Sequence, residues 1–238
     1  MWRGGLLYSV LLLLPIAVAA PAILRDEIPL DLRLPLTQPP WEDARPPAMD
    51  TDLPAAAHRH AMQTYPWYRF IQSAGDGRFV PLWYPLEGAG FPFLAAWKTR
   101  ALSPFSVPVY FLPLAQGLWC AFLLKLIIAG WCMQYLARRI GLDGLSSFCA
   151  AIAYQWSAGV YGSVDAPVSD VLAWLPLFVL GLDGIALKRP RAWALAATAW
   201  GLMLLGGEPG LGASTLLFGL VYILLRGTPN VLKTTQWT

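Results

Sequence analysis

The chain has 238 residues, of which 57% are hydrophobic and only 13% are charged. Soluble domains carry about 25% charged residues, so this composition excludes an ordinary soluble domain. The apolar residues lie in long blocks, which predicts an all-α integral membrane protein. The net charge of +3 is small and Lys and Arg form no run, so we expect no nucleic-acid partner. The three cysteines lie inside apolar stretches, in no disulfide or zinc pattern.

The apolar blocks predict about six transmembrane helices. The first block, Gly5–Leu24, follows Arg3, and we interpret residues 1–24 as an uncleaved signal anchor rather than a cleaved signal peptide. The last two spans are short, so a tilted or re-entrant hairpin is an alternative for them. A five-helix bundle is predicted over residues 116–226, before a tail at 227–238, with spans at Gln116–Ala137, Leu145–Gly162, Val171–Leu187, Ala192–Gly207 and Gly210–Leu225.

The positive charges predict the orientation of these spans. With both termini in the cytoplasm, the short outer turns hold Asp165 and Glu208 but no Lys or Arg. This distribution follows the positive-inside rule, which places basic residues on the cytoplasmic side. The inner segments then hold Arg3, Arg138, Arg139, Lys188, Arg189, Arg191, Arg226 and Lys233.

Residues 25–115 are predicted to form a large extracytoplasmic loop. It contains fourteen of the 21 prolines, and Pro29–Pro54 is expected to be extended chain along the membrane surface. We expect Ala55–Ser73 to form an amphipathic helix broken at Pro66, whose aromatic residues suit the lipid headgroup region. Pro104–Leu114 is predicted to be a second interfacial helix. A bilayer is therefore the first partner of this chain.

Several motifs in and after this loop carry a resemblance to a known family. They are Gln63-Thr64-Tyr65-Pro66-Trp67, Gly77, Pro81-Leu82-Trp83-Tyr84-Pro85, Gly88-Ala89-Gly90-Phe91-Pro92, Leu102-Ser103-Pro104-Phe105, Leu136-Ala137-Arg138-Arg139-Ile140-Gly141-Leu142 and Gly206-Gly207-Glu208-Pro209. Together they resemble YfhO-like bacterial membrane proteins, which look like relatives of the GT-C glycosyltransferases. The resemblance implies a bacterial inner membrane, a periplasmic first loop and a polyprenyl-phosphate sugar as the donor for cell-envelope glycan or lipid modification.

The chain departs from this family at two positions of the loop. Tyr84 stands where relatives carry Asn or Asp, and His58-Arg59-His60 stands where relatives carry an acid. The chain also has fewer spans than GT-C-like proteins, so we expect an N-terminal module or a shortened relative. These departures leave a second hypothesis open, in which the chain is a non-catalytic accessory subunit of a larger membrane complex. A transporter fits less well, because no inverted repeat is visible.

Transfer from a lipid-phosphate sugar requires a carboxylate that deprotonates the acceptor or holds a divalent metal, and a cation or metal at the phosphate leaving group. By the resemblance the carboxylate lies in the first outer loop, so we select Asp26 and Glu27 directly after the first span, and then Asp50 and Asp52 before the motif. Simple solvation of the loop is the alternative role of these acids. A divalent metal ion is one possible cofactor, and the sequence does not decide whether it is required.

The substrate-binding candidates are residues that could meet a lipid phosphate. Lys125 and Gln155 lie inside spans at similar depth and are predicted to pair, since an unpaired charge there costs at least about 2.5 kcal/mol. A purely structural hydrogen bond is the alternative. No residue is assigned to a metal, because His58 and His60 are too few ligands and point apart on a helix. The full candidate set is Arg69, Arg78, Trp83, Lys98, Arg100, Lys125, Gln155 and Glu208.

Overall fold

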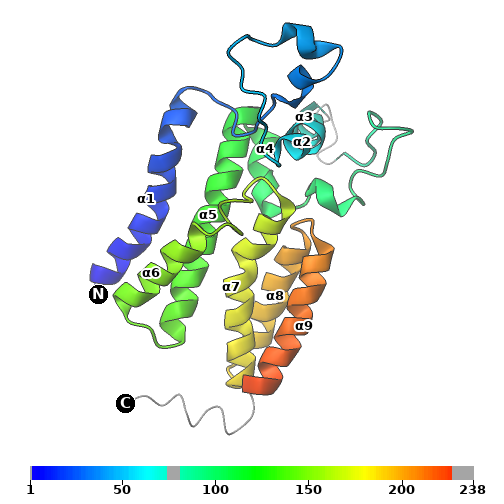
Figure 1. The fold of residues 1–238 in the computed structure, drawn as a ribbon. Coiled ribbons are helices and arrows are strands. Elements are labelled where there is room, and N and C mark those ends of the chain that lie inside the picture. The colour runs from blue at the N-terminus through cyan, green and yellow to red at the C-terminus, as the bar shows by residue number, and fades with distance from the viewer. Residues whose placement is uncertain (1, 74–80, 227–238) are drawn as a thin grey trace.

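The computed structural model describes residues 2–73 and 81–226. These residues form helices joined by turns and by one long segment with short helical turns (Figure 1). Within the described ranges no strand forms beyond a single bridge between Tyr84 and Phe91. The prediction of an all-helical chain is confirmed. Gly77, Arg78, Lys233 and the predicted tail at 227–238 lie outside the described residues.

Four helices in the described part of the chain are long and apolar enough to cross a membrane. Their high mean hydropathy and their lengths suit a bilayer solvent, which supports a multi-pass membrane protein. Proline stands in the first turn of α7, where its fixed φ favours helix initiation, so α7 starts earlier than predicted. The four helices are α1 (Trp2–Leu24), α5 (Leu114–Arg139), α7 (Pro167–Ala186) and α9 (Pro209–Arg226).

Two helices of the predicted bundle are shorter than a full span. α6 (Gly144–Gln155) has 12 residues and α8 (Ala192–Leu204) has 13. Twelve residues rise about 18 Å, which is less than the roughly 30 Å hydrocarbon core. The predicted span Leu145–Gly162 was wrong in its end, because turns occupy the chain from residue 156 to residue 166. Gly159 and Gly162, flanked by Ser157 and Ser163, favour turns over a continued helix.

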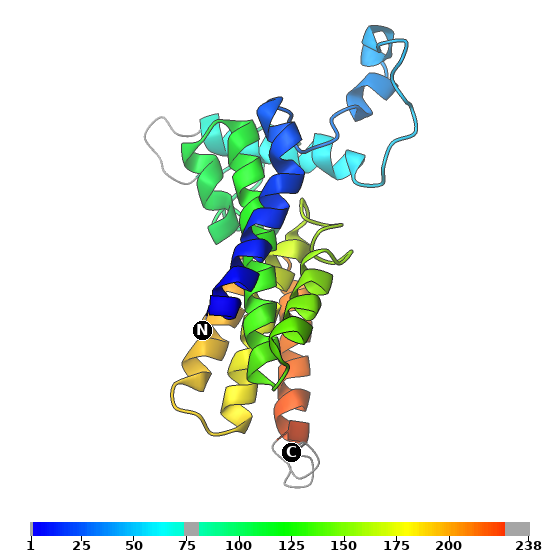
Figure 2. The ribbon, with the colours of Figure 1, turned by 90° about the vertical axis from the view of Figure 1, so that its left-hand side faces the viewer.

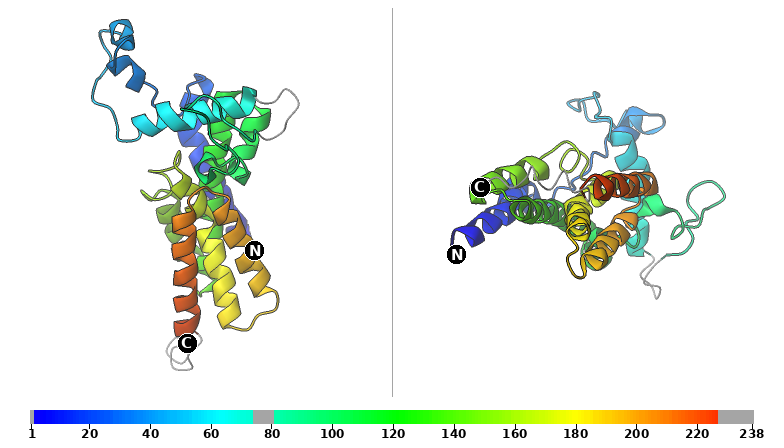
Figure 3. Two further views of the ribbon diagram at one scale, coloured as in Figure 1. Left: turned by 90° about the vertical axis from the view of Figure 1, so that its right-hand side faces the viewer. Right: turned by 90° about the horizontal axis from the view of Figure 1, so that it is seen from below.

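The helices pack side by side around α5 and α7. α6 and α1 lie against α5, while α8 and α9 lie against α7 (Figures 1 and 3). The long segment between α1 and α5 gathers at the end of the bundle where α7 begins, and its turns η1 (Leu34–Thr37) and η2 (Trp41–Ala44) project from that end (Figure 2). These turns replace part of the extended chain predicted for Pro29–Pro54.

Small residues set the close approach of α7 to α8. A Cβ atom at Gly181 would lie 2.6 Å from the backbone nitrogen of Ala196, and one at Gly184 would lie 2.7 Å from Cβ of Ala192. Small residues at such crossings let membrane helices pack backbone against backbone. Ala196 and Ala192 are the small residues of α8 at this crossing.

We expect Gly181→Ala to destabilise the fold by about 1–3 kcal/mol, because the added methyl forces α7 and α8 apart. Unfolding in mixed detergent micelles, followed by circular dichroism, measures this loss. Gly201→Ala on α8 is the matched control, since its Cβ would meet no atom within 4 Å. Equal stability of Gly181→Ala and the control would contradict the role of this contact.

We call the segment between α1 and α5 the outer segment, and its residues 57–73 form one helix that runs across Pro66. α2 (Ala57–Arg59) continues into a π-helical turn, η3 (His60–Thr64), and then into α3 (Tyr65–Ser73). The predicted break at Pro66 was wrong. Proline cannot donate the backbone hydrogen bond to the carbonyl four residues earlier, and the wider π-turn directly before it accommodates that loss.

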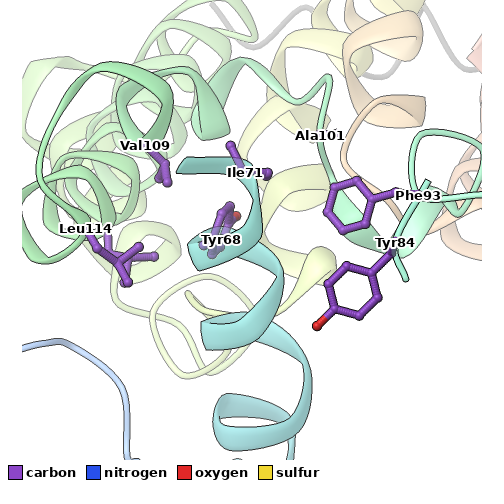
Figure 4. Packing of buried hydrophobic residues seen from close by; sticks show 8 residues of the cluster. Tyr68, Ile71, Tyr84, Phe93, Ala101, Val109 and Leu114 are labelled. Atoms are coloured by element: carbon purple, nitrogen blue, oxygen red, sulfur yellow. The ribbon is translucent and has the colours of Figure 1, made fainter. Parts of the chain in front are cut away.

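The aromatic residues of the outer segment form a core of their own. Tyr68 and Ile71 of α3 face Val109 and Leu114 on one side and Tyr84 with Phe93 on the other (Figure 4). Tyr84, the departure from the family motif, is only 4% exposed in this core. The segment Pro104–Leu114 supplies the opposite wall through η5 (Pro104–Ser106) and α4 (Val107–Phe111). The outer segment is thus a packed layer that positions residues over the start of α7.

Candidate functional site

A buried ionic network lies at the start of α7. Asp170 is fully buried, and its Oδ1 lies 2.5 Å from Nζ of Lys125 and 3.3 Å from Nη1 of Arg100. Its other oxygen accepts a hydrogen bond of 2.6 Å from the hydroxyl of Ser103. One carboxylate therefore joins α5, α7 and the outer segment. Such burial is tolerated only when the charges are paired and hydrogen-bonded.

The predicted pairing of Lys125 with Gln155 was wrong. Lys125 donates instead to the carbonyl of Val164 at 2.8 Å, in addition to its contact with Asp170. Gln155 donates to the carbonyls of Leu11 and Leu126, at 3.0 and 3.1 Å. The two side chains point to different neighbours, and Gln155 holds α1, α5 and α6 together, which is the structural role left open for it.

A second layer of ion pairs lies above this network, outside the spanning helices. Asp165 in the turn before α7 accepts from Arg59 at 2.6 and 2.8 Å, and Nε2 of His60 lies 2.9 Å from the same oxygen. The backbone carbonyl of Asp165 accepts from Arg100 at 2.9 Å. Nδ1 of His60 accepts from the backbone N–H of Asp31 at 2.9 Å. These contacts hold the outer segment against the end of the bundle.

The ion pairs of Asp165 make the stability of the fold sensitive to acid. Burial alone would raise the pKa of Asp165, but the hydrogen bonds and charges of His60 and Arg59 outweigh it and lower the pKa from 3.8 to about 2. A lowered folded-state pKa means that the ionised carboxylate stabilises the fold fully above about pH 4, and that this contribution disappears as the pH falls towards 2.

We therefore expect Asp165→Asn to be less stable than the unmodified chain at pH 5, with the difference shrinking between pH 4 and pH 2. Denaturant midpoints measured across this pH range test the prediction. Asp43→Asn in η2 is the control, because that acid is exposed and should show no such trend. A stability difference for Asp165→Asn that is constant down to pH 2 would contradict the assignment.

A cationic pocket of about 220 Å³ opens beside these ion pairs, and we call it the outer pocket. It carries three basic side chains and one acid, and the first turn of α7 forms one wall. The positive end of the α7 dipole favours an anion, although Pro167 has no N–H and the N–H of Ser169 donates to Ala166, and the guanidinium groups match a phosphate. The lining residues are Arg59, Gln63, Thr64, Trp67, Lys98, Arg100, Ala166, Pro167, Val168 and Glu208.

The buried guanidinium of Arg100 is incompletely satisfied. Arg100 is 4% exposed, yet its Nε has no hydrogen-bond partner in the described residues. Its backbone has φ +55°, in the left-handed region, and its side chain lines the pocket. A buried donor without a partner costs about 1–3 kcal/mol, so an anionic ligand that reached it would recover that cost.

The turn between α8 and α9 packs closely against Arg100 and Asp170. Gly207 has φ +89°, and a Cβ there would lie 2.7 Å from Cγ of Arg100 and 2.8 Å from the carbonyl oxygen of Trp97. A Cβ at Gly206 would lie 2.9 Å from Cβ of Asp170. Both glycines are packing residues of the turn, and they allow the turn to place Glu208 in the pocket.

The structure brings some of the predicted site residues together. Lys98, Arg100 and Glu208 line the outer pocket, and Lys125 lies below it in the ionic network. Arg69 is exposed on α3, and Trp83 is 54% exposed against Gly90, so neither lines the pocket. The substrate-binding set is therefore divided between the pocket and other parts of the molecule.

The four predicted catalytic acids do not line the outer pocket. Asp26 and Glu27 are exposed after α1, where Glu27 lies 3.6 Å from Arg25. Asp50 and Asp52 are exposed in the Pro-rich segment, and Arg33 donates to the backbone carbonyl of Asp50. In the described part of the chain, no group of three His, Cys, Asp or Glu residues could hold a metal ion.

Asp170, Asp165 and Arg59 are site residues that sequence reasoning did not select. Asp170 follows Pro167 by three residues, and an acid in the first turn of an apolar helix is a typical helix-start signal. Lys125, deep in a span, also required a counter-charge, and Asp170 is an acid at the border of a neighbouring span. Together, these two signals would have predicted the pair of Lys125 and Asp170.

No family model matches this chain, and neither the curated proteins nor the solved structures include a match.

Proposed function

We propose that this chain binds the phosphate of a polyprenyl-phosphate sugar in the outer pocket and serves as a GT-C-like module in glycosyl transfer. The observation that carries the proposal is the pocket itself, which combines Arg59, Lys98 and Arg100 with the first turn of α7. The resemblance of the outer-loop motifs to YfhO-like proteins supports the same ligand. In this proposal the reaction belongs to cell-envelope glycan or lipid modification.

The proposal includes a topology of six spans, with α6 and α8 completing the set and both termini in the cytoplasm of a bacterial inner membrane. α5 ends at Arg139, α9 ends at Arg226, and Arg189 follows the end of α7. These helix ends lie at the end of the bundle opposite the outer segment (Figure 1). This separation of charge supports the orientation. The outer pocket then faces the periplasm, at the level of the lipid headgroups.

Charge balance in the pocket supports binding of a phosphate. Asp165 and Asp170 hold the guanidinium groups of Arg59 and Arg100 in fixed positions. Lys98 is exposed and forms no ion pair among the described residues, so its charge is free for a ligand. Fixed guanidinium groups lose little conformational freedom on binding, which favours a charge-assisted contact.

The chemistry of transfer assigns roles to the same residues. The bond from the sugar's anomeric carbon to the phosphate oxygen breaks while an acceptor hydroxyl attacks that carbon. The basic side chains would stabilise the charge on the departing lipid phosphate. Glu208 is the carboxylate of the pocket and would take the proton of the acceptor.

Lys98→Gln tests the proposal directly. Loss of one charge-assisted contact should weaken binding of undecaprenyl phosphate by about 10- to 100-fold, which corresponds to about 1.5–3 kcal/mol. Ligand titration of the purified chain in nanodiscs measures the affinity. Arg69→Gln, which removes an exposed charge of α3 that does not line the pocket, is the matched control and should bind as the unmodified chain does. Unchanged affinity in Lys98→Gln would refute the assignment of the pocket.

A specific observation favours a second function, that of a non-catalytic accessory subunit. The four predicted catalytic acids lie outside the outer pocket, which leaves Glu208 as its single carboxylate among the described residues. An enzyme should lose transfer in Glu208→Gln while it keeps lipid binding. An accessory subunit should show no transfer by either protein and should co-purify with other membrane subunits in fixed proportion.

A further inference from the structure

A second cationic pocket lies at the opposite end of the bundle, and we call it the inner pocket. Its volume is about 400 Å³, and it lies between the end of α5 and the turn that joins α7 to α8. Three arginines and a tyrosine contribute polar groups, and no carboxylate is among the lining residues. These are Tyr135, Arg139, Leu180, Gly184, Arg189, Pro190, Arg191, Ala192 and Leu195.

The charges of the inner pocket are not neutralised by the protein. None of Arg139, Arg189 and Arg191 forms an ion pair with a described residue. The buried acid on this half of α7, Asp183, is engaged elsewhere by Arg226, whose Nε lies 3.3 Å from its Oδ1. Three guanidinium groups around one hollow repel one another unless an anion lies between them.

The start of α8 adds to the attraction for an anion. α8 begins at Ala192, and the residue before it, Arg191, provides no side-chain cap; the N–H groups of Ala192 and Ala194 donate to the backbone carbonyls of Arg189 and Arg191. The first turn carries the positive end of the helix dipole. The helix start and the three arginines therefore act on the same hollow.

The backbone fixes this arrangement. Lys188 and Arg191 have φ +54° and +62°, so the chain turns tightly between α7 and α8. Ala192 packs on Gly184, where an added Cβ would lie 2.7 Å from Cβ of Ala192. The floor of the pocket is small side chains held by this contact, which leaves space for a ligand group between the arginines.

The surroundings of the inner pocket identify the kind of molecule that carries the anion. Leu180 and Leu195 form an apolar wall next to the arginines. Trp193 is 71% exposed beside Arg191, and exposed tryptophans in membrane proteins gather at the level of the lipid headgroups. A phosphate attached to an apolar chain satisfies both parts of the pocket.

We propose that the inner pocket binds the phosphate of an anionic phospholipid at the membrane surface. Arg139, Arg189 and Arg191 contact the phosphate oxygens, and Leu180 with Leu195 contacts the first part of an acyl chain. Basic pockets between membrane helices are suited to such headgroups. The inference is independent of the proposed function, because it uses no residue of the outer pocket.

The test compares phosphatidylglycerol, phosphatidylcholine and inorganic phosphate as ligands of the full chain in detergent. Phosphatidylglycerol should raise the melting temperature, and phosphatidylcholine at the same concentration should not. Each arginine removed should weaken binding by about fivefold, so Arg189→Gln/Arg191→Gln should bind about 25-fold more weakly. A shift produced by millimolar inorganic phosphate alone, and lost in the double variant, would keep the phosphate site but make its ligand a soluble phosphate.

Arg138→Gln is the matched control, because Arg138 ends the same helix as Arg139 but does not line the pocket. It should respond to phosphatidylglycerol as the unmodified chain does. If the double variant does not fold, Arg139→Gln alone, at the exposed end of α5, should still bind about fivefold more weakly. Equal responses by the unmodified chain and by every pocket variant that folds would overturn the proposal, as would an equal loss in Arg138→Gln.

Discussion

Asp170→Ala is expected to destabilise the fold by about 3–5 kcal/mol. The substitution leaves Lys125, which is 1% exposed, and Arg100, which is 4% exposed, without their shared carboxylate. It also removes the acceptor for the hydroxyl of Ser103. Two buried cations then repel each other in a region of low dielectric constant, and this repulsion dominates the loss. Unfolding in mixed detergent micelles measures it.

Two further variants separate this effect from the loss of any buried acid. Asp183→Ala truncates another buried acid of α7, but its partner Arg226 lies near the helix end and can reach water, so we expect a loss of only about 1 kcal/mol. Adding Lys125→Met to Asp170→Ala should recover part of the stability, because it removes one of the unpaired charges. If Asp170→Ala and Asp183→Ala unfold at the same detergent fraction, the ionic network contributes no more to stability than the ion pair of Asp183 does.

The spanning helices could be predicted because they depend on local properties of the chain. The apolar blocks at Gln116–Ala137 and Gly210–Leu225 lie within α5 and α9. The block at Leu145–Gly162 shows the limit of this reasoning, because its mean apolarity continues through Gly159 while the helix stops at Gln155. Hydropathy reports the solvent of a segment, whereas turn residues decide where its helix ends.

The site was only partly predictable, because pairing across helices depends on which faces meet. The depth of Lys125 in its span indicated correctly that it has a partner, but depth alone selected Gln155 over Asp170. Lys98, Arg100 and Glu208 could be selected by charge and by motif, and the fold places all three in one pocket. Arg59 was not selected, because its role depends on the contact of α2 with the turn before α7, between residues 106 positions apart.

The aromatic residues of the outer segment illustrate a different limit. Tyr68 was expected at the lipid surface, and Tyr84 stands at a position where the resembled family has Asn or Asp. Both are buried in the aromatic core of the outer segment. The aromatic face of an amphipathic helix can pack against lipid headgroups or against other parts of the protein. The sequence of the helix alone does not show which of the two covers it. Phe93 and Val109 cover this face from elsewhere in the chain.

Gly207→Ala is expected to lose both stability and ligand binding at the outer pocket. Gly207 has φ +89°, a conformation that costs a residue with a Cβ about 1–3 kcal/mol. The new methyl would also lie 2.8 Å from the backbone oxygen of Trp97 and 2.7 Å from Cγ of Arg100. A backbone atom cannot move aside as a flexible side chain can, so we expect Arg100 and the segment before it to shift away from α7.

Gly141→Ala separates these two causes. Gly141 has φ +110°, and its Cβ would meet no atom within 4 Å, so this variant carries the conformational cost without the contact. Both variants should therefore lose stability, but only Gly207→Ala should also bind undecaprenyl phosphate more weakly, by about tenfold or more, as expected for one displaced charge-assisted contact. If both variants bind the lipid equally well, the turn between α8 and α9 does not position Arg100. The outer pocket would then depend on Lys98 and Arg59 alone.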